Sequence, residues 1–300
     1  MKELLPDFMR HLRDDRGLAA NSLDGYRRDL EDVLAELERL GITDPQRVQP
    51  QHLTAYLRKI RSQSRSNATV LRRRASIRAF FRYLQDDRLI LHDPSSRLEA
   101  PKPERKPQRA MSEDDIRKLL ESPNTDTPSG VRDRTMLEVL YASGLRVSEL
   151  LALDLEHVRT ELGLIVCVGP GGKERMVPIG SFCVEWVIKY IQEARPCLTR
   201  EDKPDPALFL GHLGTRMTRQ GCWKKIKELA REAGVDETMT PHTLRRSFAA
   251  HLLSGGADLR SVQEMLGHAA AASTQAYQPT EKRRLKEVYD RAHPRAREKE

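Results

Sequence analysis

The sequence has few aromatic residues and no long apolar run. Aromatic residues make up 5% of the 300 residues, so the cores are expected to consist mainly of aliphatic side chains. No stretch approaches the roughly eighteen consecutive apolar residues that a membrane-spanning helix needs. The apolar run that follows Met1 is also broken too early for a secretory signal peptide. We therefore expect a cytoplasmic globular protein without a membrane anchor.

Cysteine is also scarce, and its spacing excludes two kinds of small scaffold. No pair of cysteines forms a C-x-x-C arrangement, so the sequence indicates neither a zinc knuckle nor a small disulfide framework. The four residues are Cys167, Cys183, Cys197 and Cys222. We expect reduced, structural cysteines.

Positive charge, in contrast, is in excess. Lys and Arg number 52 against 44 Asp and Glu, a formal net charge of +8. Residues 45–85 contain ten basic residues and no acidic one. Because a solvated surface normally mixes both signs, this stretch indicates a surface that faces DNA, where released counterions favour binding. On charge alone, a basic protein without such a partner stays an alternative. The candidate DNA contacts are Arg65, Arg72 and Arg82.

The apolar pattern predicts a helical N-terminal domain followed by a linker. Apolar residues recur at helical spacing over residues 21–40, 51–60 and 66–84. Four prolines then follow within residues 92–109, and neither a helix nor a central strand tolerates that density. The predicted organisation is therefore a DNA-binding domain, an extended linker and a second domain, at 1–91, 92–109 and 110–300.

The second domain is predicted to be mainly helical with a small sheet. Residues 112–115 resemble a capping box that opens a helix. Two strand-like runs, 164–168 and 176–179, flank the glycine-rich segment 169–172 and predict a β-hairpin. Further helices are predicted at 132–142, 182–194, 218–233, 242–254, 258–266 and 281–291.

Several residues of this domain could bind or attack a phosphate, although each has an ordinary alternative. Arg146 lies where a helix begins beside free backbone N–H groups, and it could instead form a structural ion pair with Glu149. Lys173 follows the glycine turn and could reach a ligand. His242 and Arg245 are three positions apart and share one helix face. The other candidates, which alone would be typical of a surface histidine and a core tyrosine, are His268 and Tyr277.

Together these six residues suit phosphoryl transfer without a metal ion or other cofactor. Two arginines could neutralise both non-bridging oxygens of a phosphodiester. Their field would also favour the phenolate of Tyr277. A metal-dependent nuclease would need clustered carboxylates near these positions, and the sequence has none there.

The motifs resemble those of the tyrosine site-specific recombinases of the phage integrase family, and within them the Xer branch (XerC/XerD-like). The resemblance covers nearly the whole chain, and the motifs occur in the order usual for the family. They are Gly-Leu-Arg146-Val-Ser-Glu-Leu, Gly-Gly-Lys173-Glu-Arg-Met-Val-Pro, His242-Thr-Leu-Arg245, Leu-Gly-His268 and Tyr277.

The resemblance implies a role for each residue. Tyr277 would attack the scissile phosphate and leave a 3′-phosphotyrosyl link. Arg146 and Arg245 would hold the non-bridging oxygens, and Lys173 would protonate the leaving 5′-oxygen. His242 would transfer protons, and the remaining residue, which would hydrogen-bond the phosphate, is His268.

The resemblance also implies an architecture and partners. A SAM-like helical core-binding domain and an α/β catalytic domain would close on DNA as a C-shaped clamp. A homo- or hetero-tetramer, formed with a second recombinase, would act on double-stranded DNA with a short inverted-repeat site, and a helix near residues 281–291 would dock into the neighbouring subunit. Resolution of chromosome or plasmid dimers at cell division is the leading expectation. The alternatives are a phage or mobile-element integrase, a type IB topoisomerase, and a non-catalytic DNA-binding protein on the same scaffold.

Overall fold

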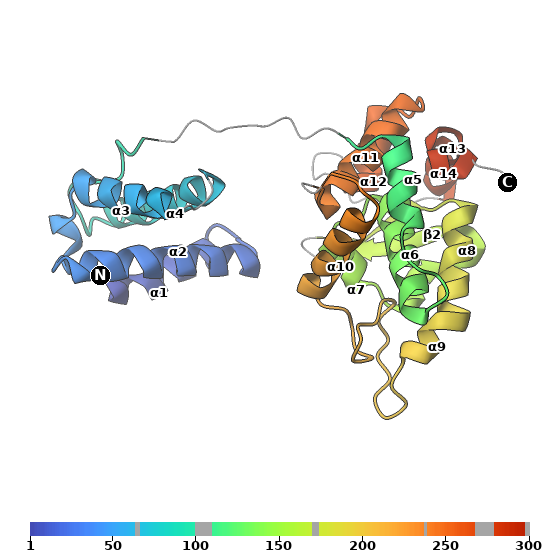
Figure 1. The fold of residues 1–300 in the computed structure, drawn as a ribbon. Helices are drawn as coiled ribbons and strands as arrows, with labels where there is room; N and C mark the ends of the chain where they lie inside the picture. Colours follow the sequence, from blue (N-terminus) through green and yellow to red (C-terminus); the bar gives the residue numbers. More distant parts are fainter. Residues whose placement is uncertain (64–66, 100–109, 170–173, 237–238, 268–278, 298–300) are drawn as a thin grey trace. The chain divides into compact units, whose positions relative to one another are not determined.

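The computed structural model describes the chain except for residues 64–66, 100–109, 170–173, 237–238, 268–278 and 298–300. It divides into two compact units, residues 1–107 and 108–300 (Figure 1). Each unit has a hydrophobic core of its own. Most of the proline-rich segment lies outside the described residues, so the linker and the exact domain bounds stay predictions.

The described part of the N-terminal unit consists of helices joined by turns and irregular segments. The helices predicted over residues 21–40, 51–60 and 66–84 are confirmed with end shifts of a few residues. The first helix buries Phe8 and Leu12, four positions apart on one face. The helices are α1 (Leu5–Asp14), α2 (Ala20–Arg39), α3 (Pro50–Ser62) and α4 (Asn67–Asp86), with 3₁₀ turns at Lys2–Leu4 and Pro45–Arg47.

A buried carboxylate joins α2 to α4. Asp29 accepts hydrogen bonds from Arg72 at 2.6 Å and from Ser76 at 3.0 Å. The side chain of Arg72 is still 53% exposed, but its charge is paired within the unit. Arg82 is 74% exposed, and its Nε lies 3.9 Å from the exposed carboxylate of Asp86, a looser pair; Arg65 lies outside the described residues. A DNA contact therefore suits Arg82 better than Arg72, and the contacts of all three stay predictions.

The residues after α4 pack back onto the N-terminal helices. Leu98 is buried in the N-terminal core. Its carbonyl oxygen accepts hydrogen bonds from Nε and Nη2 of Arg74, at 2.8 and 2.6 Å. The first part of the proline-rich segment, through Leu98, therefore belongs structurally to this unit.

The second unit is built around α6 (Pro128–Ser143), on which α5, α8 and α11 pack (Figure 1). Every residue of α6 from Gly130 to its end is buried. Within the described parts of both units, no helix is long and apolar enough to cross a membrane. The other helices are α5 (Glu113–Glu121), α7 (Val147–Ala152), α8 (Ser181–Lys189), a π-helical turn (Tyr190–Ala194), α9 (Arg195–Leu198), α10 (Arg219–Glu232), α11 (Pro241–Ser254), α12 (Leu259–Leu266), α13 (Pro279–Ala292) and α14 (Pro294–Arg297).

A small antiparallel sheet accompanies these helices, in the order β1-β2-β3. Its strands are β1 (Val158–Arg159), β2 (Leu164–Val168) and β3 (Glu174–Pro178). The predicted pairing of β2 with β3 is confirmed, and Cys167 lies opposite Arg175. The two-residue strand β1 was not predicted, because so short a strand leaves no alternating pattern.

Helices α13 and α14 pack on their own unit. The hydroxyl oxygen of Tyr289 accepts a hydrogen bond from the backbone N–H of Gly180 at 3.3 Å. Arg295 donates a charged hydrogen bond to Glu138 of α6 at 3.1 Å, and both side chains are buried. Docking of this segment into a neighbouring subunit therefore stays a prediction, and it would require these contacts to be replaced.

His293 makes the stability of this unit depend on pH. The imidazole is fully buried and stacks on Tyr289 at 4.7 Å between ring centroids. Burial lowers the pKa of His293 from 6.5 to about 3, so between these values the unfolded chain takes up a proton that the folded unit excludes. We expect the free energy of unfolding to fall by about 2 kcal/mol from pH 7 to pH 5 through this group.

The measurement is urea unfolding followed by tryptophan fluorescence, since Trp186 and Trp223 both lie in this unit. His293→Phe keeps an aromatic ring against Tyr289 and removes the titrating group. The variant should lose about 2 kcal/mol less than the wild type over the same pH interval. Equal losses for both proteins would contradict the prediction.

Candidate active site

The junction of α6 and α7 positions Arg146. Gly144 ends α6 with φ +58°, and a Cβ atom there would lie 2.4 Å from the ring of Phe248 on α11. Both the backbone conformation and this close approach require glycine. The chain then turns into α7, with Arg146 as the residue that precedes its first turn. The backbone N–H of Arg146 donates to Glu149 at 2.8 Å, which fixes the start of the helix.

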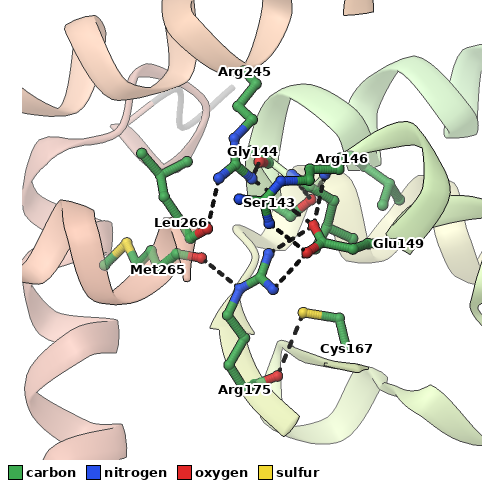
Figure 2. A network of polar contacts seen from close by, with 11 residues as sticks. Ser143, Gly144, Arg146, Glu149, Cys167, Arg175, Arg245, Met265 and Leu266 are labelled. Atoms are coloured by element: carbon green, nitrogen blue, oxygen red, sulfur yellow. Dashed lines mark hydrogen bonds and ion pairs between the residues drawn. The ribbon is translucent and has the colours of Figure 1, made fainter. Parts of the chain in front are cut away.

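Glu149 lies at the centre of a network of guanidinium groups (Figure 2). Its carboxylate accepts one bond from Nη1 of Arg146 at 2.8 Å and two parallel bonds from Arg175 at 2.9 Å. Nη1 of Arg245 lies 3.9 Å away. Burial opposes ionisation of Glu149, but the hydrogen bonds from Arg175 and from the Arg146 backbone outweigh it and lower its pKa to about 2. The carboxylate is therefore ionised at neutral pH.

Arg245 is held from two sides. It lies on α11, whose first turn is capped by the side chain of Thr240. Its Nη1 donates to the carbonyl oxygen of Gly144 and its Nη2 to that of Leu266, both at 2.6 Å. Burial, and next the charge of Arg146, lower the pKa of Arg245 to about 10, so the group stays protonated at neutral pH. Its guanidinium plane is thus fixed before any ligand arrives.

These residues line a small cavity. Its volume is about 110 Å³, and its walls are Leu145, Arg146, Val147, Ser148, Arg219, Trp223, Pro241, His242 and Arg245. The side chain of Arg146 is 33% exposed. His242 is exposed, while Arg245 is buried at the rear. The cavity is therefore lined by three guanidinium groups, those of Arg146, Arg219 and Arg245, and by one imidazole, a set that suits a tetrahedral anion.

The structure brings together three of the six predicted site residues: Arg146, His242 and Arg245. The others, Lys173, His268 and Tyr277, lie outside the described residues, so their places stay predictions. The structure confirms the ion pair of Arg146 with Glu149, and Arg146 also lines the cavity, but its contact with a phosphate stays a prediction. Among the residues that the structure describes, no three His, Cys, Asp or Glu side chains are grouped as metal ligands.

Arg175, which binds Glu149, and the cavity-lining residues Arg219 and Trp223 were not predicted as site residues. Arg175 occupies an inward position of β3, two residues before the buried Val177. A charged residue at an inward position of a strand needs a buried partner of opposite charge. The position of Arg175 in the predicted strand could therefore have indicated a buried ion pair. Trp223 lies off the buried face of α10 and is 43% exposed. A tryptophan close to basic residues in the sequence could have indicated one side of a nucleic-acid binding site.

Known proteins resemble this chain over nearly its whole length. Residues 109–284 match the phage integrase family, and residues 5–87 match the phage integrase N-terminal SAM-like domain. The chain is 43% identical to the tyrosine recombinase XerD of Listeria monocytogenes serotype 4b (strain F2365) over 99% of its length and 100% of the relative. Identity to XerD of Staphylococcus aureus (strain Mu50 / ATCC 700699) is 38%, with the same coverage.

Solved structures share the fold at lower identity. The Tn1549 transposon integrase (residues 82–397), in complex with circular intermediate DNA, superposes with a TM-score of 0.72 at 18% identity, covering 95% of this chain and 98% of that one. A lambda integrase (75–356) dimer bound to a COC′ core site gives 0.70 at 14% identity, covering 93% and 99%. They confirm the predicted fold class, mainly helical with a small sheet. The chain therefore belongs to the phage integrase family, and within it to the Xer-type site-specific tyrosine recombinases, enzymes that cut and rejoin DNA.

Proposed function

We propose that this recombinase resolves chromosome or plasmid dimers at cell division, through a 3′-phosphotyrosyl intermediate on Tyr277. The observation that carries the chemistry is the pair of guanidinium groups of Arg146 and Arg245 on one cavity. A scissile phosphate placed there would have both non-bridging oxygens neutralised. The biological role is supported by the full-length similarity to curated XerD proteins.

The proposed step is an exchange of one phosphoester bond for another. The Tyr277 oxygen attacks phosphorus, and its proton passes to His242. The bond from phosphorus to the 5′-oxygen breaks, and Lys173 gives that oxygen a proton. The remaining group is His268, which hydrogen-bonds the phosphate while its phosphorus atom is pentacoordinate. Because the covalent link keeps the phosphoester, religation needs neither ATP nor a metal ion.

The proposed assembly is a tetramer on two duplexes in the cytoplasm, with each chain closing its two units around DNA as a clamp. Related folds give examples: one solved lambda integrase is a tetramer bound to a Holliday junction. A second recombinase, or further copies of this chain, would complete the tetramer on a short inverted-repeat site. The exposed cations of the N-terminal unit, such as Arg82, would track the phosphate backbone.

The test uses a nicked duplex carrying the chromosomal site that the wild-type protein binds, with EDTA in the buffer. Cleavage beside the nick releases a short fragment, so the covalent intermediate accumulates. We expect a protein–DNA adduct that survives SDS, and mass spectrometry of its tryptic digest should find the nucleotide on the peptide that contains Tyr277. Tight binding without an adduct would contradict metal-independent cleavage by the chain alone.

A further inference from the structure

Arg175 makes the most extensive contacts of any side chain in the network around Glu149. Its Nη1 and Nη2 bind the two carboxylate oxygens side by side, each at 2.9 Å, and its Nε donates to the carbonyl oxygen of Met265 at 2.9 Å (Figure 2). The side chain is buried. Arg175 does not line the cavity, so its charge acts on the site through its neighbours.

The contacts of Glu149 are unequal. Arg175 forms a bidentate pair with Glu149, whereas the Arg146 side chain contributes a single hydrogen bond at 2.8 Å. Three guanidinium groups surround one carboxylate, so these four side chains carry a net charge of +2. With Arg175 removed, the buried carboxylate would be balanced by Arg146 and Arg245 alone, and the net charge would fall to +1.

We propose that Arg175 is a positioning residue of the recombinase: it neutralises Glu149, so that the positive charge of Arg146 and Arg245 remains available to the scissile phosphate. This inference rests on the function proposed above. Arg146 keeps one hydrogen bond to Glu149 for orientation, and the rest of its guanidinium group faces the partly exposed cavity. Glu149 orients the arginine without cancelling it.

The same side chain also holds the end of α12. Arg175 and Arg245 cap the last two carbonyl groups of that helix, those of Met265 and Leu266. Gly267 follows with φ +66°, and a Cβ atom there would lie 3.0 Å from the Arg175 side chain. Arg175 thereby fixes the position of the helix end relative to β3 and α7. These hydrogen bonds hold the Arg175 side chain in place, so its charge has a fixed position relative to Glu149.

The experiment compares the charged phosphodiester with a methylphosphonate, in which a methyl group replaces one non-bridging oxygen and removes the negative charge. Both are placed at the scissile position of the nicked duplex described above. Arg175→Met, which keeps length and burial, is expected to slow adduct formation about a hundredfold on the phosphodiester but less than about tenfold on the methylphosphonate. A merely structural loss would slow both substrates alike.

Arg132→Met is the matched control. Arg132 and Arg175 are both 6% exposed, and each binds one carboxylate and one backbone carbonyl group. Arg132 pairs with Asp133 and contacts Leu210, away from the cavity. The control variant should show the wild-type ratio of the two rates, even if its thermal stability is lower.

A double variant keeps the test informative if Arg175→Met alone folds poorly. Removing one partner of a buried ion pair is far more destabilising than removing both charges. In a Glu149→Gln background no carboxylate charge remains to neutralise. There Arg175→Met is expected to change the rate of adduct formation on the phosphodiester by less than about threefold. The effects of the two substitutions would thus be non-additive, as for a coupled pair of residues in a double-mutant cycle.

The outcomes separate this inference from the proposed function. If the wild type forms no adduct on either substrate, the proposed function is wrong and no rate ratio exists. Two results obtained with an active wild type would overturn the positioning role of Arg175. One is that Arg175→Met slows adduct formation equally on both substrates. The other is that it slows the phosphodiester reaction as much in the Glu149→Gln background as in the wild type. A selective loss on the charged substrate, abolished in that background, supports it.

Discussion

The Tyr277→Phe variant is expected to bind the nicked site with wild-type affinity and to form no covalent adduct. The replacement removes only the oxygen that would bond to phosphorus, so the contacts of the arginine residues with DNA should persist. Because the covalent intermediate forms only through the nucleophile, none should accumulate without the Tyr277 oxygen. The measurement combines a gel-shift titration with SDS gels of the same reactions.

Tyr83→Phe provides the control. This tyrosine packs against Phe8 in the N-terminal unit, so the same chemical change is made in the unit that does not carry the cavity. Adduct formation should proceed there at the wild-type rate. An SDS-stable adduct from Tyr277→Phe would show that a different nucleophile attacks the phosphate, and the proposed role of Tyr277 would have to be abandoned.

Arg245→Met is expected to lower the single-turnover rate of adduct formation by about 10² to 10³-fold, the usual cost of losing one preorganised donor to a developing anion. The effect should be large because Arg245 is buried and its plane is fixed by the carbonyl groups of Gly144 and Leu266. Arg245→Lys keeps the charge but replaces the planar fork, whose two Nη atoms bind separate carbonyl groups, with one compact ammonium group. We therefore expect a substantial loss from this variant as well.

The neighbouring Arg246→Met variant tests whether the effect is specific. Arg246 follows on the same helix but is exposed. At DNA concentrations that saturate binding, its replacement should change the rate by less than about threefold, because the charge of an exposed side chain is screened by solvent and salt. Equal losses from the two variants would mean that general positive charge, rather than the fixed group of Arg245, drives cleavage.

Helical periodicity carried most of the fold prediction. The helix around residues 21–40 has a broad apolar stripe and ends at a glycine, so its pattern is local and readable. The central helix α6 is buried nearly all round, so it was recognised from its apolar content and from Gly144 rather than from a stripe. The two-residue strand β1 depends on pairing with β2, which no local pattern records.

The candidate site was predictable where motifs are local, and not where contacts are distant. His242 and Arg245 share one helix turn, and Glu149 lies three residues after Arg146. The bond from Arg175 to Met265 spans ninety positions, and spacing alone does not indicate it. The same holds for Trp223, which α10 brings to the cavity beside α11. Long-range contacts follow from packing, which single-sequence patterns do not contain.

The ion pair between Glu138 and Arg295 has a consequence for synthesis on the ribosome. The two residues are 157 positions apart. The ribosome therefore translates α6, which carries Glu138, long before Arg295, one of the arginine residues that balance this buried carboxylate. The N-terminal unit, with its own core, can fold during that interval. A nascent chain should thus gain a folded helical unit first. The second unit should complete its fold only after residue 295 has left the exit tunnel.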